Sequence, residues 1–331
     1  MKLLLNIFLL VGFVSLLTSC EKEETPVVLP TKPADVKLIG VDMGKDYLNQ
    51  IFVNLQTGQT TAINYQSWDL AFDASSEGID IFQNGGKNIV IASSGHTKFQ
   101  HKQPTENLKF KWDEASGKTD SIVLKNVKKN GKSTDSVYII NRGLAKELLQ
   151  FQIVSIDDDK YVLDYSDMEN TYVKRVHIVK DKTKANVYFS FDNGGTYLNF
   201  EPAQTDWHIC FLRYRWIYYE FNPPLPYLVT GTFINNHFVT AAVDSSMAFY
   251  NITKANALPL QFKNQRDVIG FDWKSPDLGN LSNVKYTIRN YVTYFIREKE
   301  APYQLYKMRF IDFYNAQGVK GSPQFEVQPL H

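Results

Sequence analysis

Two residues that can bind zinc or haem iron lie close together in TDWHICFLRYRW, residues 205–216. His208 stands two positions before Cys210, and imidazole and thiolate are ligands in both kinds of metal site. In an extended strand the two side chains point to the same face, about 6.6 Å apart, so a shared metal is geometrically possible. The alternative is a core strand in which both residues are structural.

An internal repeat decides between these interpretations. Three pairs of segments match in the same order along the chain: 36–53 with 172–189, 51–72 with 187–211, and 137–157 with 293–312. Three colinear matches indicate a duplication. In the earlier copy Asp69 and Ala71 stand where the later copy has His208 and Cys210, and this pair has no comparable metal-binding character. We therefore predict a structural role for both, with Cys210 as a small buried residue.

Both copies have the pattern of antiparallel β-structure. Short runs rich in Val, Ile, Tyr, Phe and Thr alternate with turn signals such as Thr57-Gly58, Asn84-Gly85-Gly86, Asn193-Gly194-Gly195 and Gln317-Gly318. Helical periodicity is scarce, and its best candidate, residues 143–151, lies within a matched segment that favours strand and turn. We predict an all-β protein with two tandem related antiparallel domains, residues 33–170 and 171–331, in which Trp68 and Trp207 occupy equivalent places.

The N-terminus predicts a lipid anchor. Lys2 precedes an apolar run that is too short to span a bilayer comfortably, and Leu17-Thr18-Ser19-Cys20 resembles the lipobox of bacterial lipoproteins. We predict a lipoprotein signal peptide over residues 1–19, lipidation of Cys20 and a flexible tether over residues 20–32. The acidic and Lys-containing run after Cys20 is similar to a tag for the outer face of the outer membrane. An ordinary secretory signal with a chance cysteine is the alternative.

Composition and motifs exclude several classes of function. The chain has 36 basic and 35 acidic residues, so no excess of positive charge attracts nucleic acid. With Cys20 lipidated, Cys210 is the remaining thiol, and neither a disulfide framework nor a Cys-rich zinc site can form within one chain. Phosphate-binding loops, a nucleophile elbow and a His-Glu-x-x-His motif are absent from the sequence. We predict that the protein is not an enzyme.

The later copy resembles the HmuY family of haem-binding lipoproteins. The resemblance covers roughly residues 185–331 and is carried by YFSFDNGG, TDWHICFLRYRWIYY, PYLVTGTFINN and YVTYFIREKEAPYQLYKMRFIDFYNAQGVKGSPQFEV. The N-terminal half resembles a divergent copy. The resemblance implies an all-β protein anchored in the outer membrane that captures haem and passes it to a TonB-dependent receptor. It also implies that two side chains from loops hold the iron.

The iron ligands implied by the family are expected between residues 220 and 285. That window holds one histidine, His237, and one methionine, Met247, while Trp273 stands where a second histidine is expected. Imidazole and thioether both bind haem iron, so axial ligation by His237 and Met247 is a hypothesis. A solvated loop histidine and a packing methionine are the alternatives.

An aromatic segment supplies a second set of candidates. The run WIYYEFNPPLPY, residues 216–227, contains Trp216, Tyr218, Tyr219 and Tyr227, and Trp273 is a further aromatic candidate. Such rings stack on a porphyrin, but they also stack on sugars or become buried against a protein partner. The alternative function is therefore an accessory surface lipoprotein that binds a glycan or a receptor without haem.

Overall fold

Every strand pairing that the structure describes is antiparallel. The structure is a computed structural model that describes residues 33–101, 105–125, 127–129, 132–143, 146–277, 279 and 284–331. The predicted signal peptide, Cys20 and the tether lie outside these residues. Residues 34–331 form one compact unit. The predicted all-β class is confirmed.

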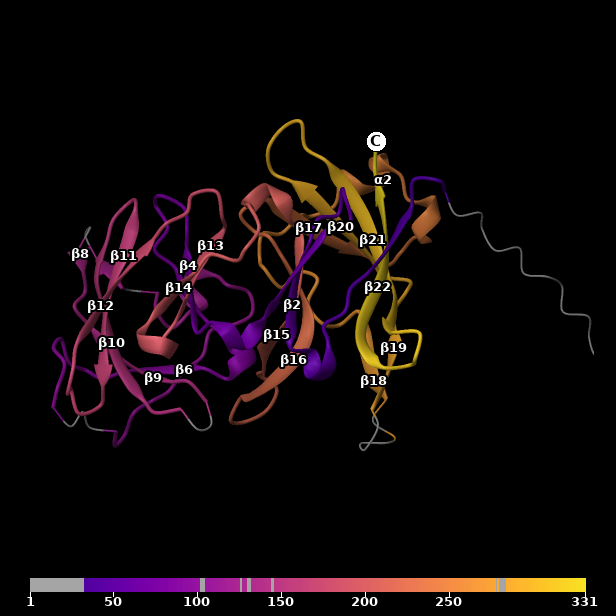
Figure 1. Cartoon of the computed structure of the whole chain (residues 1–331). Coiled ribbons are helices and arrows are strands. Elements are labelled where there is room, and N and C mark those ends of the chain that lie inside the picture. The colour runs from indigo at the N-terminus through magenta and orange to yellow at the C-terminus, as the bar shows by residue number, and fades with distance from the viewer. Residues whose placement is uncertain are drawn as a thin grey trace, which may run out of the picture. The chain divides into compact units, whose positions relative to one another are not determined.

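Four sheets account for most of the strands (Figure 1). Sheet I has the order β12 (Lys174–Val179), β11 (Lys160–Asp167), β10 (Leu149–Ile156), β9 (Val137–Asn141) and β6 (Val90–Ser93). Sheet II has the order β14 (Thr196–Leu198), β13 (Asn186–Ser190), β4 (Leu70–Asp73) and β5 (Ile81–Gln83). Sheet III has the order β16 (Leu225–Ile234), β15 (Ile209–Tyr218), β2 (Asn49–Val53) and β3 (Thr60–Asn64). Sheet IV has the order β1 (Lys37–Gly40), β22 (Lys320–Pro329), β21 (Leu305–Tyr314), β20 (Thr293–Glu298) and β17 (Val239–Asp244).

Smaller elements complete the described part of the chain. Two short hairpins pair β7 (Lys128–Lys129) with β8 (Lys132–Ser133) and β18 (Lys274–Asp277) with β19 (Lys285–Ile288). The helical elements are α2 (Lys254–Ala257) and the single 3-10 turns η1 (Lys45–Tyr47), η2 (Tyr65–Ser67), η3 (Gly85–Lys87), η4 (Thr119–Ser121), η5 (Asp192–Gly194), η6 (Gln204–Asp206) and η7 (Phe249–Asn251). None of the helices in the described residues is long and apolar enough to cross a membrane.

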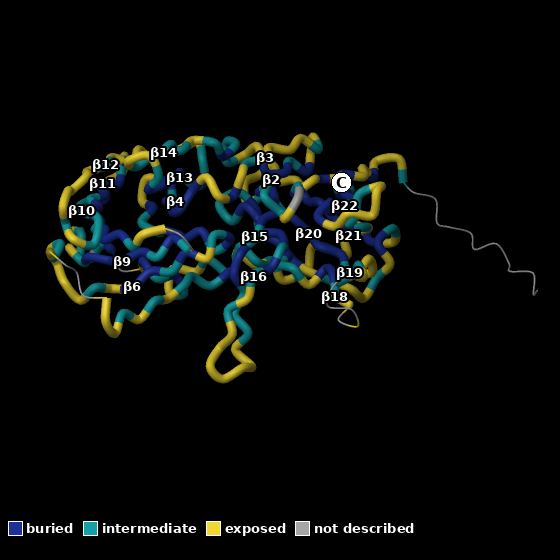
Figure 2. The backbone as a smooth tube through the Cα atoms, turned by 60° about the horizontal axis from the view of Figure 1, so that its bottom comes forward, coloured by how far each residue is buried: buried dark blue, intermediate teal, exposed yellow. Residues whose placement is uncertain are grey.

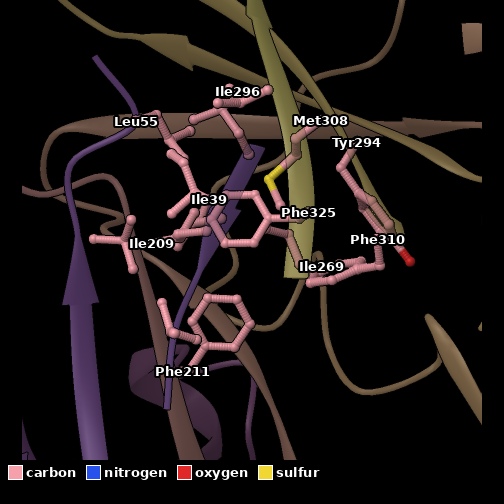
Figure 3. Close-up of a cluster of buried hydrophobic side chains, with 14 of the residues drawn as sticks. Ile39, Leu55, Ile209, Phe211, Ile269, Tyr294, Ile296, Met308, Phe310 and Phe325 are labelled. Carbon is pink, nitrogen blue, oxygen red and sulfur yellow. The ribbon is translucent and has the colours of Figure 1, made fainter. Parts of the chain in front are cut away.

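The sheets pack face to face around two apolar cores. Sheets I and II share the first core, which contains Leu70, Phe72, Ile91, Ile140, Phe151, Leu163, Val187 and Phe189. Sheets III and IV share the second (Figure 3), which contains Ile39, Ile209, Phe211, Ile296, Met308, Phe310 and Phe325. Alternation along a strand determines which of its side chains enter a core, because successive side chains point to opposite faces. Ile209 and Phe211 of β15 enter the second core, while Cys210 and Leu212 lie on the opposite face.

The two repeats exchange their first strands. β2 of the first repeat pairs with β15 of the second, while β13 of the second pairs with β4 of the first. Likewise β1 pairs with β22, and β12 pairs with β11. The order of sheet I therefore equals the order of sheet IV with the repeats interchanged, and sheets II and III are related in the same way. Figure 1 shows β2 in indigo next to the much later β15.

The sheet pairing agrees with the predicted duplication and joins strands from both sides of the expected boundary. All three matched pairs of segments fall on strands with equivalent places in the sheets. The expected boundary between residues 170 and 171, however, separates β11 from β12, which pair through Leu163 and Val176. Each sandwich is thus built from both repeats. Sequence patterning specifies that a segment is a strand, but an exchanged strand satisfies the same pattern as an unexchanged one.

The two tryptophans that mark the repeat have equivalent surroundings. Trp68 follows η2 and meets Tyr188 edge to face at 5.0 Å between ring centroids. Trp207 follows η6 and meets Phe52 in the same way at 4.9 Å. In both cases the partner ring comes from the exchanged strand of the other repeat. The two rings therefore help to fasten the exchange.

A buried asparagine holds each tryptophan segment in place. Asn84 Nδ2 donates to the carbonyl oxygens of Tyr65 and Trp68 at 2.7 and 2.8 Å. Asn235 Nδ2 donates to those of Gln204 and Trp207 at 2.8 and 3.1 Å. Asn84 begins the Asn-Gly-Gly turn, where the glycines leave room for β15. A Cβ atom on Gly86 would lie 2.9 Å from a carbonyl oxygen of β15.

We predict that the fragments 33–170 and 171–331 do not fold as separate monomers, because each would lack three strands of its sheets and would expose unpaired edges. Size-exclusion chromatography with light scattering and near-ultraviolet circular dichroism measure this directly. Mixed fragments should form a one-to-one complex with the spectrum of the intact chain. A monomeric fragment that unfolds cooperatively by itself would contradict the exchange.

Candidate functional site

His208 has a structural role in the described part of the chain. Its side chain is buried, and Nδ1 accepts a hydrogen bond from the Leu55 N–H at 3.2 Å. Nε2, which then carries the hydrogen, lies 3.3 Å from Glu298 Oε1. The hydrogen bond from His208 lowers the pKa of Glu298. No group of three or more His, Cys, Asp or Glu side chains among the described residues could hold a metal ion.

Cys210 is also part of the packing. It is buried against Phe52, Ala185 and Trp207, and burial raises the pKa of its thiol well above the usual value. A buried, protonated thiol is a poor nucleophile and a poor ligand. Trp207 lies on the side of Cys210 and not on the side of Ile209, because the regular strand begins only at Ile209.

The equivalent site in the first repeat has the same architecture with the acidic residue on the other strand. Asp69 is fully buried, and its carboxylate accepts hydrogen bonds from Arg142 Nε at 3.0 Å and from the Phe191 N–H at 2.8 Å. Lys87 also forms an ion pair with it. Thus an acid faces a base in the first repeat, and His208 faces Glu298 in the second. Buried charges persist only with such partners, so both clusters are interpreted as supports of the fold.

The second repeat differs from the first by a long hairpin. β4 and β5 span residues 70–83, whereas the equivalent β15 and β16 span residues 209–234. The core ends of the two hairpins correspond, since Phe72 faces Ile81 in one and Phe211 faces Thr232 in the other. Residues 213–231 form the extension, which we call the aromatic hairpin. Figure 2 shows its exposed end projecting from β15 and β16.

Aromatic rings follow one face of this hairpin from the interior to its tip. Ring centroids lie 4.5 Å apart for Tyr214 and Phe233, 5.5 Å for Trp216 and Phe271, 6.3 Å for Tyr218 and Tyr227, and 6.2 Å for Tyr218 and Phe221. Exposure rises along the row: Tyr214 is buried, Trp216 and Tyr218 are partly buried, and Phe221 and Tyr227 are 53% and 58% exposed. Leu225 is exposed as well, and Glu220 is the one charged residue in 216–228. The result is an exposed apolar and aromatic surface.

Two of the predicted aromatic candidates have other roles. Tyr219 donates a hydrogen bond to Glu114 Oε1 at 2.5 Å, which raises its pKa to about 12 and ties the hairpin to the loop around Glu114. Trp273 is 1% exposed and stacks on Phe310 at 4.0 Å in the second core. It therefore cannot present a ring to a surface ligand. A buried and an exposed tryptophan have the same local pattern, so only the packing distinguishes them.

The two predicted axial ligands lie at opposite ends of β17. His237 is partly buried in the turn before β17; burial lowers its pKa, and the charge of Asp73 opposes this. Met247 follows β17 and packs against an apolar cluster that includes Ile252 and Phe295. The strand between them has six residues, about 20 Å of extended chain. The structure thus does not bring the two residues to one iron.

Three cavities of the described residues can be compared with the size and polarity that a porphyrin requires. The aromatic-lined chamber between sheets II and III has a volume of about 90 Å³, whereas drug-sized ligands occupy about 300–1,000 Å³. Two larger grooves are polar. One, of about 830 Å³, is lined by residues such as Glu114, Lys118, Lys263 and Asp267, and the other, of about 410 Å³, by Lys87, Arg142 and Lys146.

The fold and the site define an antiparallel β protein of two strand-exchanged sandwiches with an exposed aromatic hairpin. The model of the HmuY family, described as HmuY protein, matches residues 46–186, which confirms the resemblance to that family. The match begins after β1 and covers the rest of the first repeat, β12 and the first residue of β13, although residues 185–331 carry the motifs that predicted it. None of the curated proteins matches this chain.

Three solved structures align with most of the chain. Apo PinO from Porphyromonas gingivitis is 9% identical, with 90% of this chain and 99% of that one covered and a TM-score of 0.27. The Apo HmuY analog of Tannerella forsythia is 10% identical, with 89% and 96% covered and a TM-score of 0.24. A candidate HmuY-like heme binding protein of Bacteroides vulgatus is 11% identical, with 89% and 91% covered and a TM-score of 0.24. Alignments with TM-scores this low support no conclusion.

Sequence reasoning missed Glu201 because a single acidic residue after a strand carries no distinctive pattern. Its side chain is buried and accepts hydrogen bonds from the N–H groups of Ala185 and Asn186 at 3.0 and 3.1 Å and from the Tyr188 hydroxyl at 2.5 Å. Burial raises the pKa of Glu201 to about 7, although these hydrogen bonds oppose the shift. The carboxyl group fastens the start of the exchanged strand β13.

We predict that Glu201 makes stability fall with rising pH. The pKa is about 4.3 in an unfolded chain, so between that pH and about 7 the folded protein keeps a proton that the unfolded chain has lost. This contribution is complete below the unfolded pKa and is lost as the pH rises through the folded pKa. In urea unfolding, the free energy of unfolding of Glu201→Gln should therefore rise by roughly 3 kcal/mol relative to that of the wild type between about pH 5 and pH 8. The exposed control Glu300→Gln should follow the wild type, and parallel profiles for all three proteins would contradict the prediction.

Proposed function

We propose that this protein is a haem-binding lipoprotein of the HmuY type and that haem stacks on the aromatic hairpin. The observation that carries the proposal is the row of exposed rings on an extension that the equivalent hairpin of the first repeat lacks. The family resemblance supports haem as the ligand. Because the extension is dispensable for the duplicated fold, its aromatic surface is explained better by binding than by packing.

The chemistry of the hairpin suits a flat aromatic ligand. A porphyrin presents two large apolar faces, and Tyr218, Phe221 and Tyr227 can meet such a face offset or edge to face. Each Å² of apolar surface removed from water contributes about 25 cal/mol of favourable free energy. The outer rings of the hairpin are exposed in the unbound protein, so covering them with a ligand would contribute this free energy to binding. The scarcity of charge between residues 216 and 228 lowers the cost of covering this surface.

The hairpin also offers oxygen donors to the iron. Tyrosine is the axial ligand of haem iron in catalase, and Tyr227 exposes its phenol at the proposed stacking surface. We therefore propose Tyr227 as a ligand in preference to the pair His237 and Met247, which β17 separates.

Absorbance titration with haemin tests the proposal. We expect a saturable shift of the Soret band, and Tyr227→Ala should weaken binding about tenfold because it removes both a ring contact and the phenol oxygen. Tyr227→Phe should retain the ring contact but alter the position of the Soret band, since it removes only the oxygen. Tyr291→Ala, which removes an exposed tyrosine outside the hairpin, is the matched control.

A wild-type protein without a Soret shift would refute haem binding, and equal affinities for Tyr227→Ala and the control would remove the hairpin from the site. A change in the band for His237→Ala or Met247→Ala would restore those residues as ligands.

The same surface favours a second candidate, a glycan- or receptor-binding accessory lipoprotein without haem. The observation in its favour is that the hairpin projects (Figure 2) and that no aromatic cavity of porphyrin size lies among the described residues. A glycan array probed with the wild type and Tyr227→Ala separates the two functions, because glycan binding without a haemin response would select this candidate.

We further propose that Cys20 anchors the protein in the outer membrane, from which it passes haem to a TonB-dependent receptor. Cys20→Ser should move the protein from the membrane fraction to the soluble fraction, because a thioether-linked lipid needs the thiol. Mass spectrometry should show the lipid on the wild type. Outer membranes that contain such a receptor should withdraw haem from the loaded protein, and retention of the haem would contradict the transfer.

A further inference from the structure

A small chamber lies at the centre of the duplicated fold, between sheets II and III. Equivalent residues of the two repeats line it in pairs: Trp68 with Trp207, Phe82 with Phe233, Asn84 with Asn235 and Ala71 with Cys210. Its volume of about 90 Å³ is well below the roughly 300–1,000 Å³ of sites for drug-sized ligands. The inner end of the aromatic hairpin lines it, but the exposed rings Phe221 and Tyr227 do not.

Three residues that line this chamber carry side-chain N–H groups without a hydrogen-bond partner among the described residues. Trp68 and Trp207 are 7% and 6% exposed, and neither indole nitrogen has a hydrogen-bond partner among the described residues. The buried Nε of Arg266 also has no hydrogen-bond partner among the described residues. Indole and guanidinium groups only donate, so together they require an acceptor. A buried donor left unpaired costs about 1–3 kcal/mol, so three such donors on residues of one lining favour an acceptor in the chamber.

Arg266 brings a positive charge into the chamber. Its guanidinium carbon lies 4.1 Å from the ring centroid of Phe82 and 5.2 Å from that of Phe233, so the equivalent phenylalanines of the two repeats hold it between them. No carboxylate of the described residues lies within ion-pair distance of it. The charge of Arg266 thus favours an anionic acceptor.

The two acidic residues of the lining accept hydrogen bonds from groups other than Arg266. Asp113 accepts hydrogen bonds from the N–H groups of Gln83 and Val123 at 2.7 and 2.8 Å. Glu114 accepts one from the Tyr219 hydroxyl at 2.5 Å. Their negative charge balances part of the positive charge of the lining arginines, but neither carboxylate is placed on Arg266.

We propose that the chamber binds a small oxyanion of the carboxylate or carbonate type, which accepts hydrogen bonds from the indole N–H groups of Trp68 and Trp207 and from the guanidinium of Arg266. The amide groups of Gln50, Gln83 and Asn186 line the chamber with unpaired oxygens and can accept from a hydroxyl of the ligand or rotate to donate. Because the donors come from both repeats, the anion would act as a bond between them.

The test uses the five indole N–H signals of the ¹⁵N-labelled protein. Titration with formate, acetate and bicarbonate, against chloride at equal ionic strength, should shift the Trp68 and Trp207 signals saturably and leave Trp216 and Trp273 in place. Trp68→Phe and Trp207→Phe assign the signals and should each weaken binding about tenfold or more, the effect of losing a charged hydrogen bond.

Arg266→Gln should abolish the response, and Arg289→Gln, which alters an exposed arginine, should retain it. Should Arg266→Gln fail to fold, Arg266→Lys and the two phenylalanine variants still test the site. Absence of a saturable shift, or nuclear Overhauser contacts from both indoles to water that persist at saturating anion, would show that the chamber holds water only and would overturn the proposal.

Discussion

The antiparallel pairing of strands between the two repeats is the interaction on which the rest of this structure depends. β2 closes sheet III against β15, β13 closes sheet II against β4, and β1 and β12 complete the outer sheets in the same reciprocal way. Each sandwich therefore needs both halves of the chain. Trp68 and Trp207, which lie just before β4 and β15, each pack on a ring of the strand received from the other repeat, so apolar packing and hydrogen bonding support the same exchange.

The exchange brings polar groups into the interior and determines which residues provide their hydrogen-bond or ion-pair partners. Asp69 and His208 occupy equivalent places, and each meets an oppositely charged or hydrogen-bonding partner at the end of an equivalent strand. The acidic residue has changed strands between the repeats while the arrangement has been kept, as expected if the pairing and not the particular residue is required. Between the inner sheets the same near-symmetry places two indole groups around one chamber.

Binding surfaces arise where the repeats differ. The aromatic hairpin is an elongation of one of two otherwise matching hairpins. Arg266 and Glu114 are a second difference. Each stands three residues after a lysine that forms a β-bridge, Lys263 with Ala241 and Lys111 with Ile91. A feature that one repeat lacks is unnecessary for the common fold. This asymmetry separates the supports of the fold from the groups that are free to contact a ligand.

The sequence by itself determined the β class, the duplication, the equivalence of Trp68 and Trp207, and the structural role of His208 and Cys210, because these follow from local patterns compared between two copies. Only the tertiary structure decided which repeat each strand joins, since a strand has the same alternation whichever edge it pairs with. It also decided that Trp273 is buried, that β17 separates His237 from Met247, and that Arg266 lines the same chamber as both tryptophans. Those relations connect residues far apart in the chain, and burial and proximity at such distances depend on packing that no local pattern encodes.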